Sequence, residues 1–270
     1  MPTMQLRDID AYYEVHGSGE ALVLLHGLGS SCRDWESQTP ALSRKFCTIA
    51  PDLRGFGRTG KPPGPYSMQR FADDLVTLLD LLHIEKAHLA GYSMGGAVAL
   101  QFANDYAARV KSLILINSPA CCVPSDWRAT LELYLRLGAA RCLGVRTAGR
   151  LVARRRFPGA DQAELRASFA ERYAENDKQA YLAALNALVD WSMDRWMHAI
   201  DVPTLVIARS GGAGPPERRA ALAAGMPNAV LQLVPEACQG PPYDRSGTFN
   251  SLMLDFYAAC TEGGMRRWAS

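Results

Sequence analysis

The sequence lacks the features that mark membrane, secreted and nucleic-acid-binding proteins. No apolar run approaches the ~18 residues that a transmembrane helix needs. Residues 1–3 are not followed by the apolar segment of a signal peptide. The net charge is only +2, which is too small to favour a nucleic-acid or membrane partner. We therefore expect a cytoplasmic protein.

Cysteine patterns typical of metal sites and disulfide frameworks are also missing. The seven cysteines are odd in number, stand mostly in apolar contexts and include no Cys-x-x-Cys pair. Such a set indicates reduced, buried thiols rather than disulfides or a zinc site. We expect neither a metal nor a cofactor.

What the sequence does contain is a regular alternation of strand and helix signals. Residues 21–25 form a continuous apolar run, which is typical of a strand buried on both faces, and residues 68–82 show helical spacing. The alternation predicts an α/β fold with a mostly parallel eight-stranded sheet and helices on both faces. Strands are expected at residues 4–6, 11–16, 21–25, 46–50, 87–90, 112–116, 204–208 and 230–233, and helices at residues 35–42, 68–82, 94–106, 217–224 and 248–259.

The alternation is interrupted after the sixth expected strand. Between about residue 118 and residue 200 the pattern is helical, rich in Leu, Ala and Arg, and contains no strand candidate. We therefore expect an α/β core formed by residues 1–118 and 201–270, with a helical cap inserted at residues 119–200.

A Gly-x-Ser-x-Gly motif lies between an expected strand and an expected helix. Residues 91–96 read Gly-Tyr-Ser-Met-Gly-Gly, and this context is the one in which the motif forms a nucleophile elbow. The glycines two positions before and two positions after Ser93 allow a turn too tight for side chains. The motif predicts that the Ser93 hydroxyl projects at the carboxyl edge of the sheet, where open α/β sheets bind ligands.

A second glycine-rich loop follows the strand expected at residues 21–25. It reads His26-Gly27-Leu28-Gly29. The backbone N–H of Leu28 and that of Met94 are candidates for an oxyanion hole, since two donors aimed at one point stabilise a developing negative charge.

These motifs together resemble the α/β-hydrolase superfamily, in its branch of small esterases, enol-lactonases and C–C bond hydrolases. The matching segments are residues 26–29, Asp34-Trp35, residues 51–57, residues 91–96 and Asn117-Ser118-Pro119. The resemblance covers essentially the whole chain and is weakest in the cap. It implies Ser93 as the nucleophile and Leu28 with Met94 as oxyanion donors, and it implies structural roles for Asp52 and Arg54.

The chain departs from the family pattern at the other two members of the catalytic triad. The position of the acid after the seventh strand is taken by Gly212, and Gln239 stands where the family has its histidine. The sequence contains no histidine after His198, so a shifted alignment does not restore the triad. Gln239 can donate and accept hydrogen bonds but cannot take up and return a proton, and we count it with Ser93 as a catalytic candidate.

Other residues are weak candidates for the missing groups. The five histidines are expected to be packing or surface residues. Asn117 and Ser118 occupy the family's alternative position for the acid, and neither is acidic. Glu236 and Asp244 remain open as substitute bases, because a carboxylate in a dry site can have a raised pKa.

The cap is rich in arginine and apolar residues. A solvated helix face is sufficient to account for the positive charge of these arginines. The more specific interpretation is that they bind an anionic or carrier-bound substrate. The substrate-binding candidates are His26, Gly27, Tyr92, Cys121 and Trp127. The cap arginines are Arg128, Arg136, Arg141, Arg146, Arg150, Arg154, Arg155 and Arg156.

Three functions remain open from the sequence. The preferred hypothesis is an enzyme that polarises a small carbonyl, ester or thioester-type substrate with Ser93 and the oxyanion hole, in lyase- or cyclase-like chemistry. The alternatives are a weak ester or thioester hydrolase and an inactive homologue that binds a ligand or serves as a scaffold. The expected partner is a small molecule, not a nucleic acid or a membrane.

Overall fold

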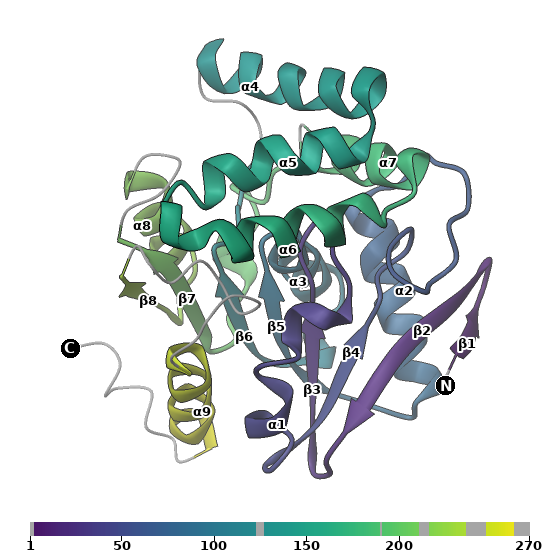
Figure 1. The fold of residues 1–270 in the computed structure, drawn as a ribbon. Helices are drawn as coiled ribbons and strands as arrows, with labels where there is room; N and C mark the ends of the chain where they lie inside the picture. Colours follow the sequence, from purple (N-terminus) through teal and green to yellow (C-terminus); the bar gives the residue numbers. More distant parts are fainter. Residues whose placement is uncertain (1–2, 123–126, 190, 211–215, 236–246, 262–270) are drawn as a thin grey trace.

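An eight-stranded sheet forms the centre of the molecule (Figure 1). The computed structural model describes residues 3–122, 127–189, 191–210, 216–235 and 247–261. The strand order is β1-β2-β4-β3-β5-β6-β7-β8, with β1 and β2 antiparallel to their neighbours and the rest parallel. The predicted fold class is confirmed. The strands are β1 Thr3–Leu6, β2 Ile9–His16, β3 Glu20–Leu25, β4 Phe46–Pro51, β5 Ala87–Tyr92, β6 Val110–Ile116, β7 Thr204–Arg209 and β8 Ala229–Val234.

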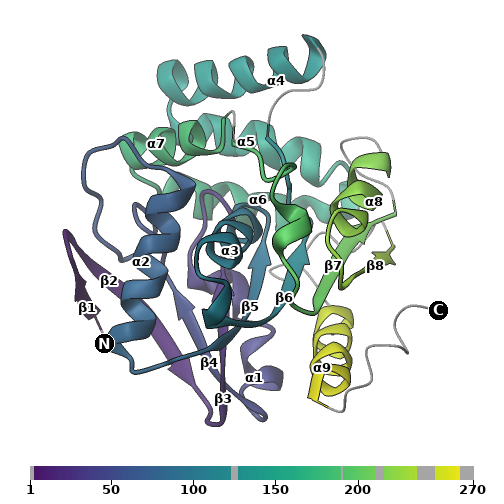
Figure 2. The ribbon, with the colours of Figure 1, turned by 180° about the vertical axis from the view of Figure 1, so that it is seen from behind.

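Helices cover both faces of this sheet (Figures 1 and 2). One face carries α2 (Met68–Leu81), α3 (Met94–Asp105) and α8 (Pro216–Ala224), and the other carries α1 (Thr39–Leu42) and α9 (Thr248–Thr261). The central strands are buried between these layers, and their continuous apolar sequence follows from that burial.

One expected helix is wrong. Residues 35–42 do not form a single helix; the segment contains a 3-10 turn, Cys32–Trp35, and the separate short helix α1. Pro40 lies in the first turn of α1, where its missing N–H costs nothing. The proline therefore marks a new helix start rather than a helix interior.

The chain segment that connects β6 to β7 forms several helices, which lie above the carboxyl edge of the sheet (Figure 1). Hydrogen bonds from Cys122 N to Trp191 O and from Met193 N to Ala120 O tie the two ends of this region together. The boundaries 119–200 for a distinct cap stay a prediction. The helices are α4 Trp127–Gly138, a π-helical turn Ala139–Leu143, α5 Val145–Arg156, a 3-10 turn Ala160–Gln162, α6 Ala163–Ala174, α7 Lys178–Leu188 and a 3-10 turn Met197–Ala199.

None of the helices in the described residues has the length and hydropathy needed to cross a membrane.

His88 on β5 gives the fold a pH dependence. Its ring lies between Ser112 Oγ (2.7 Å from Nδ1) and Glu20 Oε2 (3.1 Å from Nε2), beside Lys111 and Tyr257. Burial lowers the pKa of His88 below its usual 6.5. The unfolded chain therefore binds this proton more readily than the native state.

The free energy of unfolding is expected to fall as the pH drops below about 6.5, by no more than ~1.4 kcal/mol per pH unit. Urea titrations between pH 8 and pH 5 measure the slope. His88→Gln removes this contribution, whereas His198→Gln, at an exposed position, serves as the matched control. An equal slope in both variants contradicts the assignment.

Candidate functional site

Ser93 stands in a sharp turn between β5 and α3. Its backbone has φ 54° and ψ −114°, a region that non-glycine residues rarely occupy. The Ser93 N–H bonds Ile116 O on the adjacent strand at 2.9 Å and fixes the turn to the sheet. The side chain is partly exposed. The position agrees with a nucleophile elbow.

The glycines around Ser93 are required by close backbone contacts. A Cβ on Gly91 would lie 2.4 Å from Gly95 O, and a Cβ on Gly95 would lie 2.2 Å from Leu25 O. A Cβ on Gly96 would lie 1.8 Å from Ser118 Oγ. The strand, the helix and the loop after β6 therefore meet at van der Waals distance around the turn.

Two backbone amides are available beside Ser93. Among the described residues, neither the N–H of Leu28 nor that of Met94 has a hydrogen-bond acceptor. Met94 N is the first amide of α3, so the partial positive charge of the helix N-terminus adds to the field there. These amides are the ones that the sequence motifs predict as oxyanion donors, and that role stays a prediction.

Asp34 braces the loop that carries Leu28. Its carboxylate accepts hydrogen bonds from Gly27 N at 3.1 Å and from Ser30 Oγ. Burial raises the pKa of Asp34, against the effects of His26 and these two donors. Gly27 itself lies against the ring of Tyr92. In the sequence Asp34 stands out only as part of a family motif, whereas its contacts show that it holds the loop in shape.

His26 is occupied by backbone contacts. Its Nε2 accepts the N–H of Leu53 at 2.9 Å, so the ring proton belongs on Nδ1, which donates to Gly27 O at 2.8 Å. The ring is fully buried. Both nitrogens are used, and the position is that of a support between β3 and β4 rather than a proton acceptor for Ser93.

The other four histidines also have positions unsuited to a base for Ser93. His88 lies five residues before Ser93 on an extended strand, roughly 16 Å away. His16, His83 and His198 are exposed. All five histidines of the chain lie in the described residues, and none forms a hydrogen bond with Ser93.

The predicted positions of the other triad members are only partly described. Gly212, Gln239, Glu236 and Asp244 lie outside the described residues. Asn117, at the alternative position for the acid, has φ 47° and accepts the N–H of Arg209 through Oδ1 at 3.3 Å. It therefore ties the loop after β6 to β7.

Asp52 and Arg54 have structural contacts. The carboxylate of Asp52 accepts the N–H groups of Cys32 and Arg58. Arg54 makes paired hydrogen bonds to Asp74 and to Asp8 at 2.6–2.8 Å, and these bonds hold the pKa of Asp8 well below its usual range. Both residues brace the segment after β4.

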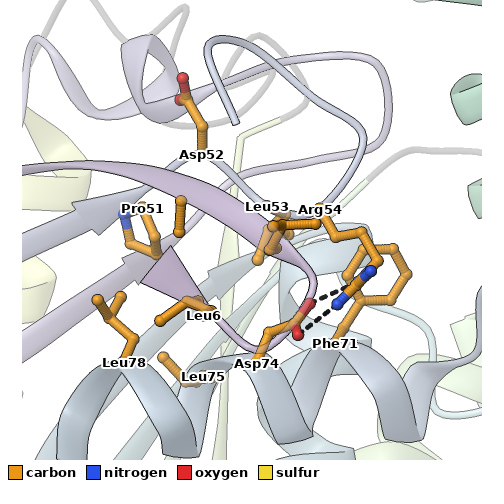
Figure 3. A pocket seen from close by; sticks show the side chains of 11 residues that line it. Leu6, Pro51, Asp52, Leu53, Arg54, Phe71, Asp74, Leu75 and Leu78 are labelled. Carbon is orange, nitrogen blue, oxygen red and sulfur yellow. Dashed lines mark hydrogen bonds and ion pairs between the residues drawn. The ribbon is translucent and has the colours of Figure 1, made fainter. Parts of the chain in front are cut away.

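A small cavity lies next to Arg54 (Figure 3). Its volume of about 20 Å³ has room for roughly one water molecule. Figure 3 shows Arg54 and Asp74 meeting at its side, while the carboxylate of Asp52 points away. Its lining includes neither Ser93 nor Leu28, so it is separate from the candidate site.

The fold and the elbow are also those of a known family. A family model described as alpha/beta hydrolase fold matches residues 20–239. The chain belongs to the α/β-hydrolase family.

Relatives within this family include named enzymes. The chain is 33% identical over 270 residues to a putative carbamate hydrolase, RutD, of Variovorax paradoxus, covering 94% of this chain and 98% of that protein. It is 28% identical over 212 residues to 3-oxoadipate enol-lactonase 2 of Acinetobacter baylyi, covering 76% and 77%. The crystal structure of the enol-lactonase from Burkholderia xenovorans matches with a TM-score of 0.84 and 26% identity, covering 95% of this chain and 100% of that one.

The remaining substrate-binding candidates of this α/β-hydrolase chain have different surroundings. Tyr92 is buried directly before Ser93, against Gly27. Cys121 is half-buried and pairs with Ser192 in an isolated bridge. Trp127 begins α4 and is 69% exposed. Their roles as substrate contacts stay predictions.

Contacts that the sequence does not indicate fasten the C-terminal end of α6 to the loop at residues 26–29, which carries the predicted oxyanion donor Leu28 and is called the oxyanion loop below. Asn176 Nδ2 donates to Gly29 O at 2.8 Å, and the ring of Tyr173 packs against Gly29, which has φ 79°. Arg33 pairs with Glu175. These partners are separated by more than a hundred residues, and no local pattern could have indicated them. They place α6 directly over the loop of this hydrolase-fold chain.

Proposed function

We propose that this chain is an α/β-hydrolase-fold enzyme that acts on a small carbonyl, ester or thioester-type substrate without a histidine–acid pair. The substrate carbonyl accepts hydrogen bonds from Leu28 N and Met94 N, and the Ser93 hydroxyl contacts the reacting group. The positions of the five histidines carry this proposal: His26 is engaged at both nitrogens, and the other four are remote or exposed. The intact elbow supports a retained reaction site.

The proposed chemistry follows from what the groups can do. A serine hydroxyl without a base is a weak nucleophile near neutral pH. It is still a hydrogen-bond donor, and two amides still stabilise negative charge on a carbonyl oxygen. Reactions that pass through an enolate-like oxygen and need no acyl-enzyme suit this set, namely C–C cleavage, decarboxylation and ring closure. Gln239, proposed from its sequence position, orients the substrate by hydrogen bonds.

The relatives support a carbonyl substrate. A putative carbamate hydrolase and an enol-lactonase are named for reactions at an acyl carbon. The 33% identity to the first of these also favours a second candidate function, a slow ester, thioester or carbamate hydrolase that uses Glu236, Asp244 or water as the base.

Labelling of Ser93 with a fluorophosphonate probe separates the two candidates. We expect labelling slower than that of an intact-triad esterase by at least about 10³-fold, because the probe reports the activated hydroxyl and triad loss costs ~10⁴–10⁶ in turnover. Mass spectrometry of the labelled peptide measures the rate, and Ser93→Ala is the control for labelling elsewhere. Rapid labelling of Ser93 would reject the proposal in favour of the hydrolase.

The Ser93→Ala variant also serves as the reference in a search for the substrate. Turnover of small oxo acids, lactones, esters and carbamates is compared between the natural chain and Ser93→Ala. A turnover that Ser93→Ala reduces at least tenfold supports a role for the hydroxyl. Ligand binding and turnover that Ser93→Ala leaves unchanged would contradict both candidates and favour an inactive scaffold.

A further inference from the structure

Arg136 on α4 is held by two tyrosine hydroxyls from two other helices. Its Nε donates to Tyr181 Oη on α7 at 3.0 Å, and its Nη2 donates to Tyr173 Oη on α6 at 2.9 Å. A guanidinium has five N–H donors in a plane. The two bonds use donors at Nε and Nη2, so the edge between Nη1 and Nη2 keeps donors for another acceptor.

The charge of Arg136 has no counter-ion among the described residues. Its described hydrogen bonds go to phenol oxygens, and no carboxylate pairs with it there. Burial raises the pKa of Tyr181, so this phenol is neutral near pH 7. A partly buried guanidinium between neutral groups is costly unless an anion joins it.

Arg136 lies next to the oxyanion loop. A Cβ on Gly29 would be 2.7 Å from Cζ of Tyr173, the carbon that bears the hydroxyl to which Arg136 donates. The guanidinium nitrogen is therefore within about 7 Å of that point. Gly29 directly follows Leu28, the proposed oxyanion donor. Tyr173 thus contacts both Arg136, through its hydroxyl, and the residue after Leu28, through its ring.

A second guanidinium, that of Arg156, lies close to the turn at Ser93. The Cζ of Arg156 is 5.2 Å from the ring centroid of Tyr92 and 5.7 Å from that of Phe169. Phe169 stacks on Tyr173 with centroids 4.9 Å apart. A series of contacts therefore runs from Arg136 through Tyr173 and Phe169 to Arg156, which lies over the ring of Tyr92 beside Ser93.

We propose that Arg136 is a substrate-binding residue that takes a carboxylate of a small carbonyl compound, whose carbonyl group lies at Leu28 N and Met94 N. The free edge of the guanidinium matches the two oxygens of a carboxylate. Tyr173 and Tyr181 hold the guanidinium in this orientation. The substrate class is thus a carboxylate-bearing ester, lactone or ketone. The assignment rests on the proposed function, because it assumes that the substrate carbonyl lies at Leu28 N and Met94 N.

Binding of half-esters and diesters tests the assignment independently of catalysis. Monomethyl and dimethyl esters of the straight-chain dicarboxylic acids with four to eight carbons are titrated against the Ser93→Ala protein, by calorimetry at low salt. Each pair has nearly the same shape and differs by one negative charge. We expect the half-ester of the best-fitting length to bind at least tenfold more tightly than its diester, and the preference to shrink with salt.

Arg136 variants identify the residue responsible. In the Ser93→Ala background, Arg136→Gln is expected to weaken the half-ester at least tenfold and to leave the diester unchanged, which also shows that the site is intact. Arg136→Lys keeps the charge but not the fork and should retain part of the preference. Arg150→Gln, at an exposed position on α5, is the matched control and should change neither affinity.

Three results would overturn the assignment. The first is that no half-ester binds more tightly than its diester at any chain length, or that neither binds. The second is a preference for the half-ester that survives Arg136→Gln. The third is an equal loss of that preference in Arg150→Gln. If Arg136→Gln lowers the melting temperature too far for titration, Arg136→Lys and Tyr181→Phe replace it, and an unchanged preference in both overturns the assignment. Failure of the proposed chemistry is separate, because it appears as missing turnover while the charge preference remains.

Discussion

The double substitution Gly212→Asp and Gln239→His is expected to raise hydrolysis of p-nitrophenyl acetate at least about 100-fold over the natural chain. An intact triad contributes on the order of 10⁴–10⁶ to turnover, whereas the oxyanion hole and binding alone give ~10³–10⁴ over water. Ser93 has the backbone conformation of a nucleophile elbow, and the amides of Leu28 and Met94, the proposed oxyanion donors, have no acceptor among the described residues. The expected gain is therefore large, even if the new pair is imperfectly placed.

The single substitutions and a triple variant serve as controls. Gln239→His alone should give a smaller gain, because the imidazole lacks an acid to orient it. Adding Ser93→Ala to the double variant should abolish the gain. Initial rates at saturating ester, measured on proteins of equal melting temperature, give the comparison. If the double variant hydrolyses no faster than the natural chain, the site has changed in more than its base and acid, and the proposed substrate position at Leu28 and Met94 is wrong.

The parts of the site that a short sequence segment encodes could be predicted. Ser93, Met94 and Leu28 each have glycines within two residues. The two glycine-rich segments contact each other at Gly27 and Tyr92 and at Gly95 and Leu25, because β3 and β5 are adjacent parallel strands. The order of a parallel sheet brings the carboxyl ends of its strands together. Local motifs combined with this rule therefore predicted that the loop at residues 26–29 lies next to the turn at Ser93, while the catalytic roles of these residues stay predictions.

Contacts between distant segments could not be predicted in the same way. Asn176 and Gly29 are 147 residues apart, and Arg136 meets Tyr173 and Tyr181 across three helices. Arg136, Tyr173 and Tyr181 also fit a solvated helix face when each is taken alone. Only the packing of the cap helices on the oxyanion loop distinguishes the two interpretations. The expected single helix at residues 35–42 was wrong for a related reason, since the sequence did not show that a new helix starts at Thr39 with Pro40 in its first turn.

Replacing Gly95 by alanine is expected to destabilise the protein by at least about 3 kcal/mol, whereas Gly138→Ala should stabilise it by about 0.5–1 kcal/mol. Both glycines lie in helices, so the change in intrinsic helix propensity is the same. A Cβ on Gly95 would lie 2.2 Å from Leu25 O and 2.7 Å from His26 O. Among the described residues, a Cβ on Gly138 would meet nothing within 4 Å, and the φ of −62° suits alanine.

Urea titrations of the two variants give their free energies of unfolding. If both substitutions change this free energy in the same direction, the argument from the Cβ contacts is contradicted. The atoms that a Cβ on Gly95 would strike are carbonyl oxygens of the chain entering the oxyanion loop, and they cannot turn aside as a flexible side chain can. Folded Gly95→Ala protein must therefore displace Leu25 and His26, and with them the amide of Leu28. The expected loss of half-ester binding in this variant links the tight turn at Ser93 directly to the position of the oxyanion donor.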